Sequence, residues 1–160
     1  MILYAVTIFL SAFLLFQVQP LIAKLILPWF GGTSAVWSSC MLFFQVVLLG
    51  GYLYAHWLHE KLSPRWQAMV HTAVLGASLL VLPLNPDASW KGEALRNPSW
   101  AILGLLATAV GLPYFVLSTT SPLIQAWYAK SRAGSVPYRL FALSNLASLL
   151  ALVSYPALVE

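Results

Sequence analysis

The sequence predicts an all-α integral membrane protein, a polytopic bundle of about five transmembrane helices. Hydrophobic residues make up 61% of the 160 residues and charged residues only 8%, and the mean hydropathy is +0.83. Soluble domains carry about 25% charged and about 45–50% apolar residues. A soluble core of this size cannot hide so much apolar surface, so we expect lipid to cover the rest. Residues 1–160 are therefore expected to form one transmembrane domain.

Five segments of the chain are long and apolar enough for a span, which needs about 20 mostly apolar residues. Short links that contain polar residues, glycine or proline separate them. Tryptophans near several segment ends, such as Trp57, Trp66 and Trp127, favour these boundaries because amphipathic rings settle at the membrane interface. The predicted spans are residues 2–27, 35–58, 66–84, 100–127 and 138–159.

The loop lysines and arginines predict the orientation of the bundle. Five lie in the second and fourth links and their flanks, on the side of the N-terminus, and three lie on the opposite side. Cytoplasmic loops carry the excess of these residues. We therefore expect a cytoplasmic N-terminus and a C-terminus on the far side. The five are Lys61, Arg65, Lys130, Arg132 and Arg139, and the three are Lys24, Lys91 and Arg96.

The first span contains polar residues where lipid would penalise them. Gln17, Pro20 and Lys24 follow one another at i, i+3 and i+7, so they share a helical face. One interpretation is that this face lines a cavity, since ionisable groups within spans are functional candidates. The alternative is that the Lys24 ammonium simply reaches the nearby interface. Both interpretations stay open at the level of sequence.

The fourth span is interrupted by prolines and by a cluster of hydroxyl residues. Pro113 removes a backbone donor and clashes with the carbonyl four residues earlier, and Ser118, Thr119, Thr120 and Ser121 follow it. A freed carbonyl in lipid needs hydroxyls, water or neighbouring protein. Broken helices of this kind frame binding sites in secondary transporters. The alternative is a kinked packing helix, and in either case we expect the cluster to face protein or a watery cleft.

Small residues predict where helices approach one another closely. Gly104, Ala107 and Gly111 form one stripe, against which we expect the first span to pack with Gln17 and Lys24 turned inward. Another stripe in the last span comprises Ser144, Ser148 and Ala151. Asn145 beside it is a cavity-lining candidate. The alternative for Asn145, Gln45 and Gln125 is hydrogen bonding between helices.

Two histidines raise a haem hypothesis. His56, near the end of the second span, and His71, near the start of the third, are predicted at similar depth on antiparallel helices. Histidine is a common axial ligand of haem iron. Interfacial histidines without a ligand are far commoner, so we predict no cofactor and no metal site.

Several function classes lack their signatures in this sequence. A nucleic-acid binder needs a clustered basic face, and the basic residues here are spread over loops. Gly31-Gly32 and Gly50-Gly51 are bare pairs without the strand context of a nucleotide loop. No paired-carboxylate site is formed, and we predict no catalytic residue. The acids are Glu60, Asp87, Glu93 and Glu160.

Three stretches resemble the membrane domain of bacterial proteins described as fused major-facilitator/spermidine-synthase-like. They are FLLFQVQPLIAKLILPWFGGTSAVWSSCMLFFQVVLLGGYLYAH at 13–56, GLPYFVLSTTSPLIQAWYA at 111–129 and RLFALSNLASLLALVSYPALVE at 139–160. The resemblance implies a multi-pass protein of the bacterial cytoplasmic (inner) membrane with a transporter-like membrane half. It also implies a following soluble domain similar to polyamine aminopropyltransferases. That domain does not lie within these 160 residues, so we do not expect this chain to be an enzyme.

Three functions follow as hypotheses. The first is a transporter-like module for a small polar solute, such as a polyamine, although no acidic residue lies within a predicted span to pair with a cation. The second is a structural or anchoring subunit that docks beside other membrane subunits or a second copy. The third is a haem-bearing electron-transfer subunit. Whether the chain is a fragment, a split subunit or a complete protein is left open by the sequence.

Overall fold

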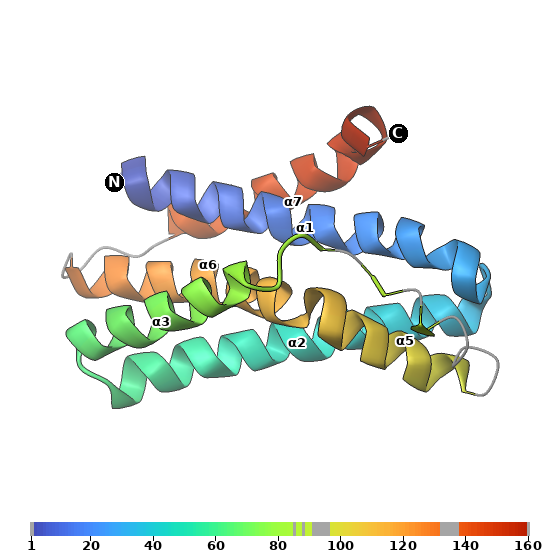
Figure 1. Ribbon diagram of the computed structural model, residues 1–160. Helices are drawn as coiled ribbons and strands as arrows, with labels where there is room; N and C mark the ends of the chain where they lie inside the picture. The colour runs from blue at the N-terminus through green and yellow to red at the C-terminus, as the bar shows by residue number, and fades with distance from the viewer. Residues whose placement is uncertain (1, 85, 88, 91–96, 132–137, 160) are drawn as a thin grey trace.

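The computed structural model describes residues 2–84, 86–87, 89–90, 97–131 and 138–159, and it is all-helical in architecture (Figure 1). Within these described residues, four helices are long and apolar enough to cross a membrane. The elements are α1 (Ile2–Phe30), α2 (Ser34–Lys61), α3 (Pro64–Leu79), α5 (Pro98–Leu106), the π-helical turn η1 (Ala107–Gly111), α6 (Leu112–Ser131) and α7 (Tyr138–Val159).

The turn between α1 and α2 is built from residues suited to it. Gly31 has a φ of +80°, a conformation that side chains with a β-carbon disfavour. Two residues later, the Thr33 side chain accepts a hydrogen bond from the backbone N–H of Val36 at 3.4 Å and caps α2. The sequence Gly31-Gly32-Thr33 thus ends one long helix and starts the next.

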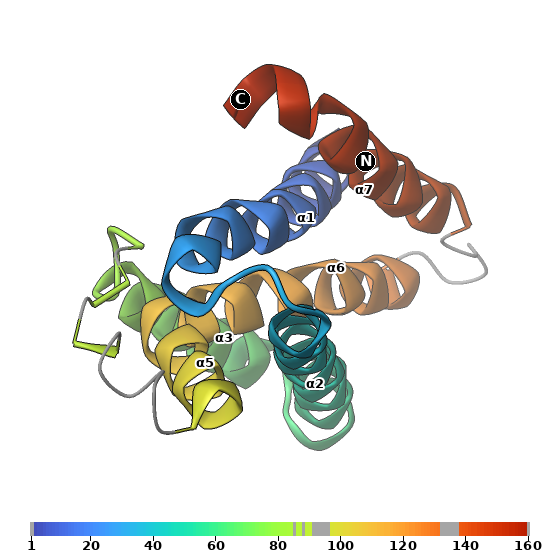
Figure 2. The same cartoon turned by 90° about the vertical axis from the view of Figure 1, so that its right-hand side faces the viewer.

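Long antiparallel helices lie side by side in the bundle. In Figure 1, α1 and α2 run in opposite directions, and α5, η1 and α6 form one continuous helix beside them. The closest packing joins α1 to α7, α2 to α6 and α1 to α6. Figure 2 shows α7 and α2 on either side of α6, and α7 packs mainly against α1. The bundle is therefore compact around α1, α2 and α6 and open between α2 and α7.

The helix predicted over residues 66–84 is present but shorter than expected. The observed helix α3 has 16 residues, Pro64–Leu79, and is not among the four segments that could span a membrane. At 1.5 Å per residue it is about 24 Å long, against about 30 Å for the hydrocarbon core. Residues 80–84 beyond it are not helical, and Trp90, farther along the segment that leads to α5, packs against the main core. Among the described residues, the regular helix therefore covers only the first part of the predicted span.

The fourth predicted span is a helix of 34 residues, Pro98–Ser131, with one irregular turn. The five residues of η1 are π-helical, and Pro113 follows two residues later. A π turn loosens the hydrogen-bond ladder to i→i+5, and such turns sit where a helix accommodates a local disruption. Pro113 has no N–H to place in an α-helical ladder, so a wider turn ahead of it keeps the helix continuous.

The small-residue stripe of this helix, Gly104, Ala107 and Gly111, was predicted to pack against α1. At Gly104 a tryptophan side chain lies against it instead. A β-carbon on Gly104 would overlap the indole of Trp90. Trp90 lies in the segment between α3 and α5, and it packs against the main core together with Leu84. The prediction that α1 closes on the stripe is wrong at Gly104, where the tryptophan occupies the space.

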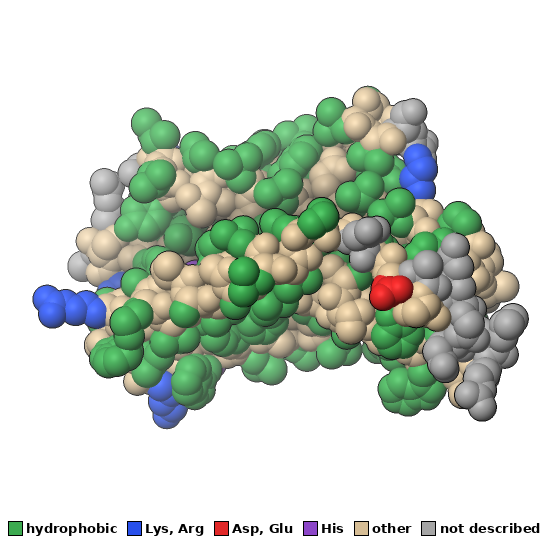
Figure 3. All heavy atoms as spheres, in the orientation of Figure 1, with side chains coloured by type: hydrophobic (Ala, Val, Ile, Leu, Met, Phe, Trp, Pro, Cys, Tyr) green, Lys and Arg blue, Asp and Glu red, His purple; other side chains and the backbone are tan. Residues whose placement is uncertain are grey.

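The surface of the bundle is apolar over most of its length. Figure 3 shows apolar side chains over the middle of one face and basic side chains toward its ends. Exposed residues include Leu53 on α2 at 60% and Val153 on α7 at 69%. Exposed apolar patches of this extent mark lipid or protein contact. This distribution is typical of a helical bundle in contact with a bilayer.

Candidate functional site

A polar cleft lies between α2, α6 and α7. It consists of two adjoining cavities of about 480 Å³ and about 190 Å³, which share lining residues from all three helices. The smaller cavity also reaches α1 at Ala12, Leu15 and Phe16. The shared lining residues are Tyr52, Ser121, Ser144 and Asn145.

Hydroxyl and amide groups supply the polar surface of this cleft. The Ser121 and Ser144 hydroxyls lie 3.4 Å apart and join α6 to α7. Gln125 Nε2 donates to Ser121 Oγ at 3.3 Å, and the Ser148 hydroxyl donates to the Ser144 carbonyl at 2.9 Å. Asn145 is exposed at the rim. These groups can donate and accept hydrogen bonds without carrying charge.

Helical periodicity brings these residues together. Ser121 and Gln125 are four residues apart on α6, as are Ser144 and Ser148 on α7, so each pair lies on one face. The small residues Ala126 and Ala129 hollow the α6 side of the cleft. Because α6 and α7 present small or polar side chains toward each other, these side chains leave space between the two helices for the cleft.

The cleft lies within the lengths of α6 and α7, toward the end of the bundle that holds the α2–α3 turn. Ser121 is ten residues before the end of α6, which places it about 15 Å from that end. Ser144 is six residues after the start of α7, or about 9 Å along it. Unpaired polar groups at such depth cost several kcal/mol each in hydrocarbon. Ser121, Ser144 and Ser148 are hydrogen-bonded within the protein, so the exposed side chains of Tyr52 and Asn145 are the polar groups of the cleft that water or a solute could meet.

The hydroxyl cluster of α6 divides into lining and packing residues. Ser118 and Ser121 line the smaller cavity. Thr119 is fully buried and donates to the Val116 carbonyl at 2.8 Å, as does the half-buried Thr120. The expectation that the cluster faces protein or a cleft holds for the buried Ser118 and Thr119 and for Ser121.

The π-helical turn η1 contains a hydroxyl residue, Thr108, that was not predicted to take part in its hydrogen bonding. Thr108, within η1, donates to the carbonyls of Gly104 and Leu105 at 3.0 Å each. Pro113 is half-buried and is not among the residues that line the cleft. We expected the Ser118–Ser121 cluster to satisfy carbonyls beside Pro113. The hydrogen bonds of the cluster instead stay within α6 or reach α7, and it is Thr108 that bonds to carbonyls beside the π-helical turn.

Gln17 and Lys24, which were predicted to share one polar face of the first span, have different surroundings in the structure. Gln17 Nε2 donates to the Ala151 carbonyl of α7 at 2.8 Å and to Ser154 Oγ at 3.3 Å. Lys24 is exposed, so the expectation that it turns inward is wrong. The polar link from α1 to α6 is made by Gln19, whose Nε2 donates to the Tyr114 hydroxyl at 2.6 Å. Gln17 is a contact with α7 and does not line the cleft.

The two histidines of the haem hypothesis do not face each other. His71 is buried, and its ring lies 6.3 Å from that of Tyr54 on α2. His56 is exposed and lies two residues from Tyr54. Residues two apart on a helix point in different directions. Among the described residues no group of three or more His, Cys, Asp or Glu side chains could hold a metal ion.

Tyr52, which lines both cavities, was not predicted from the sequence. The sequence carries no signal for it because its role depends on how α2 is rotated against α6 and α7. Ser144 and Ser148 were interpreted only as a packing stripe. The stripe does pack at Ala151, which is fully buried, while its two serines line the smaller cavity.

Comparisons with known proteins return no match: no family model, no curated protein and no solved structure is similar to this chain.

Proposed function

We propose that this chain is a multi-pass membrane module whose cleft between α2, α6 and α7 binds a small polar solute. The observation that carries the proposal is the cleft itself. Hydroxyl and amide groups from three helices line a space of several hundred Å³ at a depth where lipid would penalise them. Sites between helices of a bundle, with few placed polar groups on apolar walls, are typical of small-molecule binding.

The lining favours an uncharged solute over a polyamine. None of the described residues that line the cleft is charged, and the polar groups of the lining are hydroxyl, phenol and amide groups. A buried cation needs a carboxylate or an equivalent partner.

The sequence strings that resemble fused major-facilitator/spermidine-synthase-like membrane proteins support the same proposal. The resemblance favours the bacterial cytoplasmic membrane, and the distribution of loop lysines and arginines favours an N-terminus inside. Ser118 and Ser121 lie in one of these strings, and Ser144 and Asn145 lie in another. The resemblance is to the transporter-like half of those proteins, which agrees with solute binding and assigns no enzymatic activity to this chain.

Binding measurements on the purified protein in lipid nanodiscs test the proposal. We would screen neutral polyhydroxylated solutes, small carboxylates and spermidine by thermal shift, and then determine affinity by calorimetry. Ser121→Ala and Tyr52→Phe should weaken binding of the responding solute about tenfold or less, since each removes one hydrogen bond of about 0.5–1.5 kcal/mol. Ser39→Ala, on the exposed part of α2, is the control. The proposal fails if no solute binds, or if the cleft variants and the control behave alike.

A second candidate function is that of a subunit that packs against other membrane proteins. The observation that favours it is the return segment after α3. α3 starts beside the C-terminal end of α2 and runs back along it, and it stops about 18 Å short of the N-terminal end of that 28-residue helix. Non-helical backbone at such depth is tolerated only when protein covers it or when it lines a water-filled cavity. Leu80 is 87% exposed there, so the cover would come from another chain or a second copy.

Crosslinking separates the two candidates. In a Cys40→Ala background, a cysteine at Leu80 should crosslink in native membranes to a second protein chain if this segment is an interface. A cysteine at Leu53, exposed on α2, is the control. Crosslinking at Leu80 without solute binding would favour the subunit function. If the cysteine at position 80 forms no crosslink and is labelled only by lipid-borne reagents, the subunit function is refuted.

A further inference from the structure

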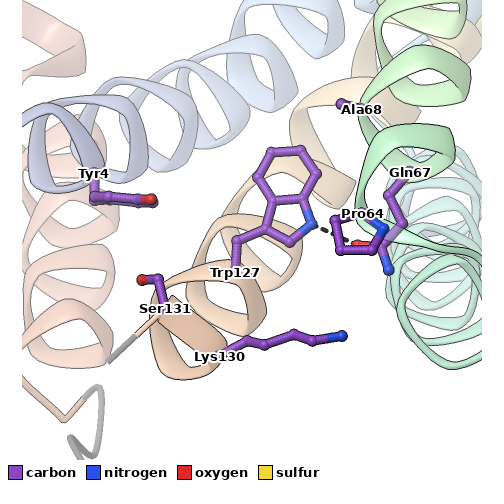
Figure 4. A pocket seen from close by; sticks show the side chains of 7 residues that line it. All are labelled: Tyr4, Pro64, Gln67, Ala68, Trp127, Lys130 and Ser131. Carbon is purple, nitrogen blue, oxygen red and sulfur yellow. Dashed lines mark hydrogen bonds between the residues drawn. The ribbon is translucent and has the colours of Figure 1, made fainter. Parts of the chain in front are cut away.

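We propose that a groove between the start of α1, the start of α3 and the end of α6 binds the headgroup of an anionic phospholipid. The groove has a volume of about 350 Å³ and is separate from the polar cleft (Figure 4). This inference depends on the proposed membrane placement but not on solute binding. Its lining residues are Tyr4, Pro64, Gln67, Ala68, Trp127, Lys130 and Ser131.

The groove lies where a bilayer interface would meet the bundle. Tyr4 is the third residue of α1, Pro64 is the first of α3, and Ser131 is the last of α6. Tyrosine and tryptophan are enriched at this level of the membrane because their rings are apolar with one polar edge. A pocket at this position is open to a lipid headgroup.

The lining combines one cation with apolar walls. Pro64, Ala68 and the Trp127 ring supply apolar surface, and Lys130 is exposed at the edge of the groove. In Figure 4 the Lys130 side chain extends from α6 toward the start of α3, and the Tyr4 hydroxyl points toward the groove. A phosphate bound there would receive one ammonium and hydroxyl contacts, while the glycerol backbone would rest on the apolar walls.

The wall formed by Trp127 is held in place by hydrogen bonds. Its Nε1 donates to Gln67 Oε1 at 2.6 Å, and Gln67 Nε2 donates to the carbonyls of Leu62 at 2.7 Å and His59 at 3.3 Å. Gln67 is only 1% exposed. Both ends of its amide are therefore occupied by protein, so the amide positions the wall and does not contact ligand.

The charge around the groove favours an anion. The described residues at this end of the bundle include the cations Lys61, Arg65 and Lys130, against the single acid Glu60. Arg65 follows Pro64 directly in the sequence and is exposed, although it is not one of the residues that line the groove. Anionic lipids of the cytoplasmic leaflet are attracted by juxtamembrane lysine and arginine, and basic pockets between helices bind their headgroups. A phospholipid is favoured over a soluble phosphate because the walls are mostly apolar.

Native mass spectrometry in a neutral detergent tests this site without a charged bilayer surface. The probe is phosphatidylglycerol, with phosphatidylcholine as the zwitterionic comparison. The wild type should retain one phosphatidylglycerol that phosphatidylcholine does not replace. Lys130→Gln should weaken retention about fivefold or more, the effect expected for one cation near a lipid phosphate. Lys61→Gln is the matched control, because Lys61 is exposed at the same end and does not line the groove.

A second variant keeps the test independent of charge. Ala68→Trp fills the groove, leaves every cation in place and should abolish retention, while circular dichroism reports whether the helices persist. The site would be overturned if Lys130→Gln and Lys61→Gln reduce phosphatidylglycerol retention equally while Ala68→Trp retains the lipid as the wild type does. That result would show a diffuse charge effect. Displacement of the lipid by millimolar inorganic phosphate would also overturn it, by assigning the groove to a soluble anion.

Discussion

Gly51 of α2 lies directly against Ser118 of α6. A β-carbon built on Gly51 would stand 3.0 Å from the Ser118 Cβ and 3.3 Å from the Thr119 methyl group, and it would overlap the Ser118 hydroxyl. Small residues allow helix backbones to approach closely, which is how helices associate where lipid removes the hydrophobic driving force. The α2–α6 packing, and with it the position of Tyr52 beside the cleft, depends on this absent side chain.

Gly51→Ala should therefore destabilise the bundle by about 1–3 kcal/mol, the cost of overpacking a tight contact. Gly50→Ala is the matched control, because its β-carbon would meet only Phe115 at 3.9 Å, an ordinary contact. Alanine also improves helix propensity by about 1 kcal/mol, so the control should be neutral or stabilising. Thermal unfolding in detergent, followed by circular dichroism, measures both. Equal midpoints for the two variants would contradict the close approach.

Gln67→Leu should destabilise the α2–α3 turn. The change leaves the Trp127 N–H and the Leu62 carbonyl without their partners, and each buried unsatisfied group costs about 1–3 kcal/mol. Trp127→Phe removes only the N–H and should cost less. Trp66→Phe is its control, since Trp66 is 56% exposed. Thermal unfolding should rank Gln67→Leu as the least stable, and a neutral Gln67→Leu would refute the role of this hydrogen-bond network.

Gln17→Leu should loosen α7. Gln17 provides hydrogen bonds from α1 to α7, and α7 packs mainly against α1. Hydrogen bonds between helices in membranes contribute about 0.6 kcal/mol on average and up to about 1.7 kcal/mol. Hydrogen exchange at the amides of α7 should accelerate, while that of α2 should not. Gln45→Leu, at an exposed position of α2, is the control, and identical α7 protection in both variants would contradict the prediction.

Cysteine labelling tests the topology of the chain. In a Cys40→Ala background, cysteines at Ser63 and Asp87 should label from opposite sides of the membrane. Ser63 lies in the α2–α3 turn, and Asp87 lies in the segment that returns to the start of α5. The Ser89 backbone N–H donates to Asp87 Oδ1 at 2.8 Å and holds the pKa of that carboxyl below its ordinary value, as suits a charge at the aqueous end. Labelling of both positions from one side would show that residues 64–97 do not cross.

The return segment shows the limit of hydropathy as a predictor. Residues 66–84 are apolar enough to be predicted as a span, yet the helix ends at Leu79. The sequence Pro83-Leu84 and the following polar residues could have moved the boundary by a few residues. They could not reveal that the chain would lie against Gly104 through Trp90, because that contact depends on the α5 surface. Where the chain runs after α3 therefore depends on a contact between distant segments, which hydropathy does not report.

The candidate site was predictable in part. The hydroxyl cluster of α6 and Asn145 stood out because polar groups in an apolar span need partners, and Ser118, Ser121 and Asn145 do line the cleft. Gln17 and Lys24 stood out for the same reason, but one contacts α7 and the other is exposed. Polarity within a span signals that a residue has a partner, and it does not say whether that partner is protein, solute or the interface.

The sequence by itself determined that this protein is an apolar helical bundle with basic residues toward its helix ends, and four of its five predicted spans are helices long and apolar enough to cross a membrane in the described part of the chain. Composition and helical periodicity are local properties, and lipid solvation acts on each helix separately. The tertiary structure alone decided which helices meet, through the Gly51–Ser118 contact and the rotation of α7 on α1. Those choices depend on shape complementarity between surfaces far apart in the chain, and they created both the polar cleft and the interfacial groove.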